Sequence, residues 1–203
     1  MLLHPARPWD LRPVDADDPP VPDPDLWPSV GVVVPARNEA DLIGPTLGAL
    51  DQQDYPGEMS VVVVSERSTD ATADVAREMA RVARHGIEVI DGAPLPDGWV
   101  GKVWGMDQGI RLHRETTAPE WLLLTDADIH HSHNSVRMLV ADALARGVAL
   151  NSRMARLRCA SLAERLLIPS FVLFFFLLYP LRWANRAGSR TASAAGGCIL
   201  VRA

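Results

Sequence analysis

Short runs of β-branched and aliphatic residues alternate with longer segments of helical periodicity, and this alternation constrains the fold most. The runs cover residues 30–34, 60–64, 87–90 and 121–125, and apolar residues recur every three or four positions in the segments between them. Strands alternating with helices of this length predict an α/β fold, a mostly parallel sheet covered by helices on both faces. Ligands bind such sheets beyond the carboxyl ends of the strands. The residues following the first, second and fourth runs are therefore the candidates for a functional site.

Polar residues and glycine mark the expected helix ends. Asn38 is expected to cap the first helix, with Glu39 in its first turn, where a carboxylate favours the positive helix end. Asn134 is expected to cap the fourth helix, and Gly147 to end it. A Gly/Pro-punctuated loop from Asp91 to Gly101 is expected to lead to a third helix containing Val103, Met106 and Ile110.

Charge is distributed unevenly along the chain. The 20 Lys and Arg against 25 Asp and Glu argue against a surface devoted to nucleic acid. Residues 151–190 nevertheless hold seven arginines and one acid, Glu164, a local balance of +6 that leaves −11 for the rest. The two cysteines are too few for a disulfide framework and have no metal-binding spacing, which favours a reducing compartment.

A carboxylate pair directly follows the fourth run. Asp126 and Asp128 are one residue apart, so both side chains can reach the same edge of the sheet. Mg²⁺ and Mn²⁺ prefer oxygen ligands, and one or two carboxylates plus substrate phosphates commonly hold them. Taken alone, such a pair also occurs in solvated turns, so its position beside the other strand ends is the stronger argument.

Four longer segments occupy the strand ends and the chain's end in a specific order. They are Val-Pro-Ala-Arg-Asn-Glu-Ala, Gly-Trp-Val-Gly-Lys-Val-Trp-Gly, Leu-Thr-Asp-Ala-Asp-Ile and Ala-Ala-Gly-Gly-Cys-Ile-Leu-Val-Arg. In order and spacing they resemble family-two glycosyltransferases, most of all the hopene-associated enzymes of hopanoid biosynthesis, over residues 27–202. The resemblance implies a GT-A-like fold, that of nucleotide-diphospho-sugar transferases, and the residues discussed below add an expected apolar membrane-interface helix near the C-terminus.

The resemblance also implies roles for the matching residues. Glu66 would meet the base or ribose, although most relatives carry two aspartates where this chain has Ser65-Glu66, so the base preference stays open. Asp126 would approach the ribose and donor sugar, and Asp128, with Asp126 beside it, would hold the Mg²⁺ or Mn²⁺ that bridges the diphosphate. The other residues expected to line the nucleotide pocket are Pro35, Ala36, Arg37, Glu39 and Lys102.

The catalytic residues expected from this pattern are Asp126, Asp128 and Lys102. A metal across the diphosphate neutralises charge that grows as the sugar–phosphate bond breaks, and Lys102 adds to that field. The alternative for Lys102 is a solvated lysine at a helix start, where a cation opposes the helix dipole. An inverting transferase also needs a general base, which the family carries downstream of Gly196-Gly197. No Asp or Glu follows Glu164, so we expect a fragment of a longer enzyme; the alternative is a natural truncation that binds donor without transfer.

Histidines and tryptophans near these segments have two interpretations each. His130, His131 and His133 follow Asp128 closely, but consecutive histidines at a helix start are more often exposed caps than metal ligands. Trp99 and Trp104 could form a wall of the sugar pocket, and packing of the third helix against the sheet is the expected role.

An apolar segment, residues 166–181, lies between arginines. Its 16 residues would rise about 24 Å as a helix, less than the roughly 30 Å of a hydrocarbon core, and Pro169 and Pro180 interrupt it. Ser161 and Glu164 form a capping-box pattern at its start. We expect a helix in the membrane interface, with arginines meeting anionic headgroups; the alternative is a buried core helix.

The sequence thus divides into four parts: a Pro/Asp-rich extended leader (1–28), a nucleotide-sugar-binding core (29–158), a membrane-associated segment (159–190) and the start of an acceptor-side region (191–203). The expected function is metal-dependent transfer of a sugar from a nucleoside-diphosphate sugar to a lipid or polyprenoid-type acceptor. It is expected at the cytoplasmic face of the bacterial inner membrane, with no nucleic-acid partner. The alternatives are a nucleotidyltransferase, against which the lack of a Gly-rich phosphate loop counts, and a non-catalytic membrane-surface binding module.

Overall fold

The computed structural model describes residues 22–186 and 188–203, which form two compact units. One unit comprises residues 22–154 together with Ala195–Ala203, and the other comprises Ala155–Ala194. The extended leader expected at 1–28 lies mostly outside the described residues. Within its described end, the ring of Trp27 packs edge-on against Tyr55, and the Tyr55 hydroxyl donates to the Pro28 carbonyl.

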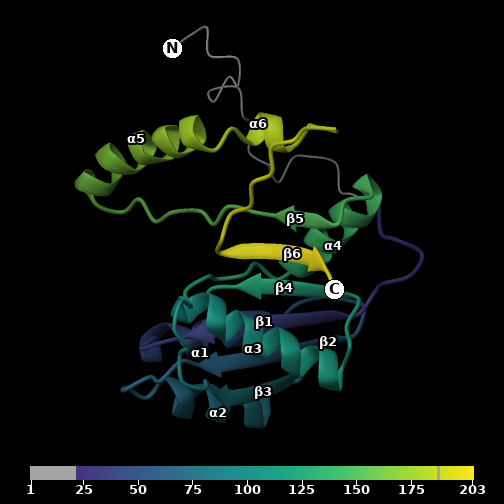
Figure 1. The fold of residues 1–203 in the computed structure, drawn as a ribbon, viewed down its shortest axis with the longest axis vertical. Coiled ribbons are helices and arrows are strands. Elements are labelled where there is room, and N and C mark those ends of the chain that lie inside the picture. Colours follow the sequence, from purple (N-terminus) through teal and green to yellow (C-terminus); the bar gives the residue numbers. More distant parts are fainter. Residues whose placement is uncertain (1–21, 187) are drawn as a thin grey trace, which may run out of the picture. The chain divides into compact units, whose positions relative to one another are not determined.

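The first unit is built on a six-stranded sheet with the order β3-β2-β1-β4-β6-β5 (Figure 1). Four strands are parallel, and β6 is antiparallel to both β4 and β5. The bounds are β1 Val30–Ala36, β2 Met59–Ser65, β3 Gly86–Asp91, β4 Trp121–Thr125, β5 Leu150–Ser152 and β6 Cys198–Arg202. The predicted mostly parallel α/β sheet is confirmed.

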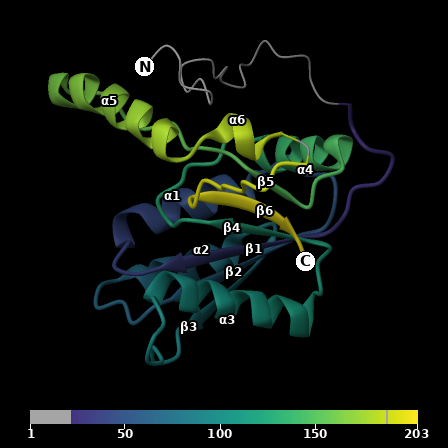
Figure 2. The ribbon, with the colours of Figure 1, turned by 45° about the horizontal axis from the view of Figure 1, so that its top comes forward.

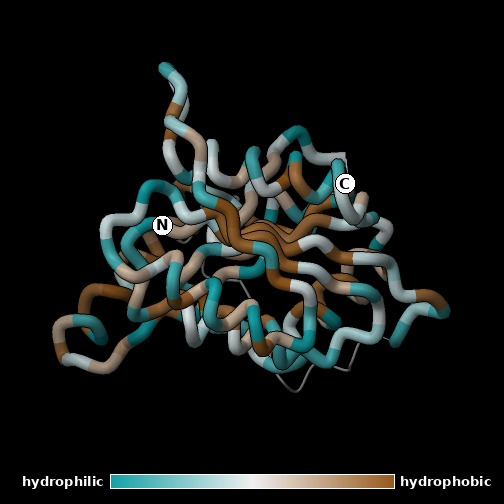
Figure 3. Tube along the Cα trace, turned by 90° about the horizontal axis from the view of Figure 1, so that it is seen from below, coloured by the Kyte–Doolittle hydropathy of each residue, from teal (hydrophilic) through white to brown (hydrophobic). Residues whose placement is uncertain are grey.

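Helices cover both faces of this sheet (Figure 2). Apolar residues of α1 (Ala40–Asp51), α2 (Thr72–Val82) and α4 (Ser135–Arg146) share one core with alternate residues of the strands. The third helix, α3 (Gly101–Thr116), packs on the opposite face, against β1 and β2. Hydrophobic residues gather along the strands in Figure 3, as expected for a sheet buried on both sides.

The expected helix containing Val103, Met106 and Ile110 forms as α3, and its buried face holds small residues. Val103 is 53% exposed, while Gly105, Gly109 and His113 are buried. A Cβ on Gly109 would come within 2.5 Å of the Val33 side chain. Helix α3 therefore lies too close to β1 for a larger side chain at this position.

The start of α1 is also held differently from the prediction. Asn38 adopts a left-handed conformation (φ 56°) and Glu39 occupies the cap position without a side-chain cap. The Ala40 amide instead donates to Asp70 Oδ2 at 3.2 Å, from the loop after β2. Asn38 is used between loops, since its Oδ1 accepts from the Thr69 amide. Local sequence could not show this, because the partner lies about 30 residues away.

The ends of α4 agree partly with the prediction. Gly147 ends the helix in the left-handed conformation (φ 63°), as expected. Asn134 does occupy the cap position, but its side chain caps nothing, and the Val136 amide donates to Gln53 Oε1 instead.

The second unit contains α5 (Leu162–Leu178) and the short α6 (Leu181–Ala184). The predicted capping box is present: Ser161 Oγ accepts from the Glu164 amide, and Glu164 Oε2 accepts from the Ser161 amide. No residue of α5 is buried, so the alternative of a buried core helix was wrong. Among the described residues, no helix has both the length and the apolar character needed to cross a membrane.

The observed division of the chain into compact units differs from the expected division into four parts. The second unit covers Ala155–Ala194 rather than residues 159–190. Residues 195–203 belong to the first unit, because β6 pairs with β4 at the centre of that unit's sheet. Strand pairing decides this, and residues nearly 80 positions apart in the chain make the pair.

Candidate functional site

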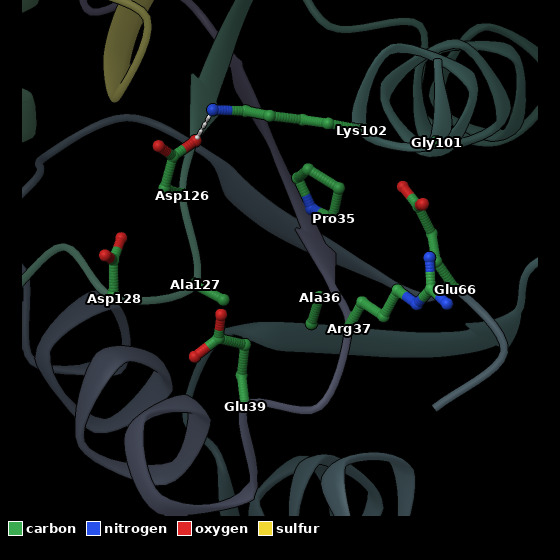
Figure 4. A pocket seen from close by; sticks show the side chains of 10 residues that line it. All are labelled: Pro35, Ala36, Arg37, Glu39, Glu66, Gly101, Lys102, Asp126, Ala127 and Asp128. Carbon is green, nitrogen blue, oxygen red and sulfur yellow. Dashed lines mark ion pairs between the residues drawn. The ribbon is translucent and has the colours of Figure 1, made fainter. Parts of the chain in front are cut away.

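A pocket opens where the carboxyl ends of β1, β2 and β4 meet the N-terminus of α3. Its volume is about 360 Å³. The lining residues include every predicted site residue: Pro35, Ala36, Arg37, Glu39, Glu66, Lys102, Asp126 and Asp128, together with Gly101 and Ala127 (Figure 4). The topology thus brings together segments that are up to about 90 residues apart in the chain.

One side of the pocket is acidic. Asp126 and Asp128 follow β4, and Glu39 precedes α1 on the same side (Figure 4). The pKa of Glu39 is raised, first by burial and then by the negative charges of Asp128, Asp70 and Asp126. The carboxylates are therefore close enough to repel one another, and a bound cation would reduce this repulsion.

The donor chemistry of this side fits Mg²⁺ or Mn²⁺. The available ligands are carboxylate oxygens, which hard divalent cations prefer. Among the described residues, no group of three or more histidine, cysteine, aspartate or glutamate side chains is arranged as a metal site. Asp126 and Asp128 would therefore supply part of a ligand set, which substrate phosphates would complete, as is usual for Mg²⁺.

Lys102 crosses the pocket to the acidic side. It stands in the first turn of α3, and its Nζ lies 2.5 Å from Asp126 Oδ1. The Lys102 side chain is 45% exposed, so the pair remains open to solvent and to a ligand. The interpretation as a lysine that points only into solvent does not describe this structure.

Glu66 lies on the other side, packed against the glycines of α3. A Cβ on Gly101 would come within 2.7 Å of Glu66 Oε2, and a Cβ on Gly105 would overlap Oε1. Burial raises the pKa of Glu66, while the Arg37 charge and the Gly105 backbone oppose that rise. Gly101 and Gly105 of α3 have no side chains, and this leaves room for the methylene by which Glu66 is longer than an aspartate.

Sequence reasoning missed the roles of Gly101 and Ala127 in the lining. Gly101 lets α3 approach Glu66, and Ala127 lies between the two aspartates. Both residues lie within the motifs quoted above. The sequence signal that could have identified them is the small size of these residues inside those motifs.

The three histidines after Asp128 have different environments. His130 and His133 are exposed, but His131 is only 5% exposed, so the expectation of an exposed cap was wrong for His131. Its Nε2 lies 2.9 Å from Thr125 Oγ1 and its Nδ1 lies 3.1 Å from Ser135 Oγ. Both ring nitrogens are therefore engaged with hydroxyl groups.

The two tryptophans pack together and do not line the pocket. The rings of Trp99 and Trp104 meet edge-to-face at 5.1 Å, and Trp104 Nε1 donates to the Ala93 carbonyl. They join the loop before α3 to its first turns, whereas the expected role was to pack the helix against the sheet.

Comparisons with known proteins agree with this geometry. Residues 28–170 match the family described as "Glycosyltransferase like family 2". The 4,4'-diaponeurosporenoate glycosyltransferase of Staphylococcus aureus (strain bovine RF122 / ET3-1) is 39% identical over 83 residues, 40% of this chain and 20% of that protein. The chain therefore spans about a fifth of the length of this curated relative.

Solved structures show the same fold. The mannosyltransferase PcManGT from Pyrobaculum calidifontis, in complex with GDP-Man and Mn²⁺, superposes with a TM-score of 0.64 at 23% identity, over 97% of this chain and 50% of that one. The glucosyl-3-phosphoglycerate synthase of M. tuberculosis superposes with a TM-score of 0.53 at 19% identity, over 86% of this chain and 57% of that one. Because residues 28–170 account for most of the chain, this protein belongs to glycosyltransferase-like family 2 and has its GT-A-like fold.

Proposed function

We propose that this protein takes part in metal-dependent transfer of a sugar from a nucleoside-diphosphate sugar to a lipid or polyprenoid-type acceptor. The single observation that carries the proposal is the pocket at the strand ends. In this cavity of about 360 Å³, the two aspartates that follow β4 face Lys102 of α3. Arg37 and Glu66 line the other side of the same cavity.

Each side of the pocket suits a different part of the donor. Arg37 and Glu66 would contact the nucleoside, because they lie at the ends of β1 and β2, away from the aspartates (Figure 4). Asp126 and Asp128 would hold the cation, and Lys102 would exchange its contact with Asp126 for the diphosphate. A divalent cation at this place would stabilise the charge of the leaving diphosphate.

The transfer would break the bond between the sugar's anomeric carbon and the diphosphate, and would form one to the acceptor oxygen. The acceptor proton must pass to a base. We expect inversion at the anomeric carbon, with this base supplied from outside the pocket residues described above.

The acceptor class is suggested by two features. The S. aureus relative is named a 4,4'-diaponeurosporenoate glycosyltransferase, which fits a polyprenoid-type acceptor. In addition, α5 presents an exposed apolar stripe with the spacing i, i+4, i+7 and i+11, formed by Leu167, Phe171, Phe174 and Leu178. A helix of this kind beside seven arginines suits the surface of an anionic membrane. We place the protein at the cytoplasmic face of a bacterial inner membrane, and hopanoid biosynthesis is our proposed context.

Donor binding tests the core of the proposal. UDP-sugars and GDP-sugars would be titrated calorimetrically with and without Mn²⁺, against wild type, Asp128→Asn and the matched surface variant Asp74→Asn. We expect Mn²⁺ to strengthen donor binding in wild type and Asp74→Asn, and Asp128→Asn to lose about tenfold or more of that gain. No metal-dependent binding in wild type, or an unchanged gain in Asp128→Asn, would refute the proposal.

Vesicle sedimentation tests the membrane part separately. Wild type should sediment with vesicles containing anionic lipid and less well with neutral vesicles, because the arginines would attract the headgroups. Replacing both Phe171 and Phe174 with serine should weaken sedimentation about tenfold or more, since each phenylalanine is worth about 1.5–3 kcal/mol when fully buried. Equal sedimentation of both proteins would contradict a role for the stripe.

Turnover distinguishes the remaining alternatives. A nucleotidyltransferase would release pyrophosphate from a nucleoside triphosphate, whereas the family assignment favours release of a nucleoside diphosphate from the sugar donor. A binding module would bind vesicles without any affinity for nucleotides.

A further inference from the structure

The acid loop, which we define as residues 126–129, is held by hydrogen bonds between its backbone and other segments of the chain. Thr46 Oγ1, from α1, donates to the Ala127 carbonyl at 2.7 Å. The Asp126 amide donates to the Gly197 carbonyl at 3.2 Å, just before β6. The loop is thus held between a helix and the segment that precedes an antiparallel strand.

A chain of buried polar side chains extends this support. Thr125 Oγ1, at the end of β4, donates to the same Gly197 carbonyl at 3.1 Å and contacts His131 Nε2 at 2.9 Å. His131 Nδ1 contacts Ser135 Oγ, at the start of α4, at 3.1 Å. The residues therefore link β6, β4 and α4 across the base of the acid loop.

The hydrogen bonds of this chain allow two proton arrangements around a neutral His131. If the Thr125 hydroxyl donates to Gly197, its oxygen accepts the proton of His131 Nε2, and Nδ1 accepts the Ser135 hydroxyl proton. If the Ser135 hydroxyl instead donates to Gln53 Oε1 at 3.2 Å, its oxygen accepts the proton of Nδ1, and Nε2 accepts the Thr125 hydroxyl proton. Both arrangements keep the two contacts of the ring and require a neutral imidazole, and burial, with a smaller effect of His130, lowers the pKa of His131 to about 4.

We propose that His131 is a positioning residue that, through Thr125 and Ser135, holds Asp126 and Asp128 at the spacing needed for metal-dependent donor binding. This inference rests on the proposed function. His131 touches neither donor nor metal; it acts through the loop. Supporting residues of this kind commonly contribute 10–100-fold to metal affinity, since small displacements of the ligands weaken the site.

A second buried histidine provides the matched control. His113 of α3 is 1% exposed, and its two ring nitrogens contact Thr117 Oγ1 and the Val32 carbonyl, both at 3.1 Å. It resembles His131 in burial and in hydrogen bonding, but it lies on the opposite face of the sheet, away from the acid loop. A loss of stability without a loss of positioning is therefore expected for its variants.

The experiment compares His131→Leu, His131→Gln and His113→Leu with wild type. The readout is the Mn²⁺-dependent gain in donor affinity, measured at a temperature where each protein is folded. We expect His131→Leu to lower the gain by about tenfold while metal-free nucleotide affinity stays unchanged. His131→Gln should recover most of it, because its amide can donate to Thr125, and His113→Leu should keep the wild-type gain.

Two outcomes would overturn the inference. In the first, His131→Leu keeps the wild-type Mn²⁺-dependent gain in donor affinity. In the second, His131→Leu and His113→Leu lose this gain equally. If His131→Leu does not fold, Ser135→Ala replaces it: a reduced gain supports the inference and a wild-type gain overturns it.

A separate spectroscopic readout does not depend on the proposed function. Nitrogen-15 shifts of the His131 ring at neutral pH should show one protonated and one bare nitrogen, and two protonated nitrogens would overturn the neutral imidazole on which the hydrogen-bond chain depends. If wild type shows no metal-dependent gain at all, the proposed function fails, and this inference fails with it while the ring shifts stay as expected.

Discussion

The first unit buries several polar side chains beside its apolar core, whereas the second unit leaves an apolar helix exposed. The first unit buries His113, His131 and Gln53, and it packs α3 against the sheet through glycines. The second unit exposes leucines and phenylalanines along α5. Hydropathy alone therefore does not decide burial in this protein, because polar side chains are buried where hydrogen-bond partners surround them, and four predictions test this contrast.

The largest expected effect is the pH dependence of stability that arises from the buried His131. The pKa of His131 is about 4 in the folded protein, below its ordinary 6.5, so the unfolded chain takes up the proton first as pH falls. The neutral, buried His131 contributes fully to the free energy of unfolding above pH 6.5. This contribution decreases by roughly 3 kcal/mol as pH falls to 4. The difference in free energy of unfolding between wild type and His131→Gln should shrink by that amount, measured by urea unfolding from pH 7 to 4. Parallel curves would show that His131 is not held neutral by burial.

The next effect concerns the glycine contact of α3. Gly109→Ala should lower the free energy of unfolding by about 1–3 kcal/mol, because the new methyl group would meet Val33 at 2.5 Å. The matched control is Gly48→Ala in α1, where the new methyl group would lie 3.8 Å from Met79. That control should stabilise the protein by about 0.5–1 kcal/mol through lower backbone entropy in the unfolded chain. Similar effects of both variants would remove the distinction between the helices.

A smaller effect is expected at the start of α5. Ser161→Ala removes the hydrogen bond from the Glu164 amide and should destabilise the helix by about 1 kcal/mol. Hydrogen exchange should accelerate in residues 162–170 and stay unchanged in the strands of the first unit. Faster exchange in β1 or β4 would indicate that the two units unfold together.

The smallest effect concerns the exposed stripe. Phe171 and Phe174 are each 57% exposed, and replacing both with serine should change the free energy of unfolding in water by less than about 0.5 kcal/mol per residue. Denaturant midpoints without lipid would measure this. A loss of several kcal/mol would mean that the stripe is covered in solution, and would break the contrast between the units.

Much of the fold and the site was predictable from local patterns. The strand at residues 121–125 was placed at its observed bounds, and the capping box of Ser161 and Glu164 forms as expected. The eight predicted lining residues share one pocket because parallel strands end at the same edge of a sheet. The metal, donor and acceptor roles of these residues stay predictions.

Features that depend on contacts distant in sequence were not predictable. Asp70 provides the partner for the α1 N-terminus, and β6 joins the core sheet beside β4. His131 is buried while His130 and His133 are exposed, and the Thr125 that it contacts is bonded to Gly197, 72 positions further along the chain.

The sequence alone determined the alternation of strands and helices, the family motifs and the chemical types of the pocket residues, because these depend on short-range periodicity and on residue identity. Only the tertiary structure decided which histidine is buried, how closely α3 approaches the sheet, and that the Gly197 carbonyl holds the acid loop. Those outcomes depend on distances between segments far apart in the chain, and burial and hydrogen bonding arise only once these segments are packed together.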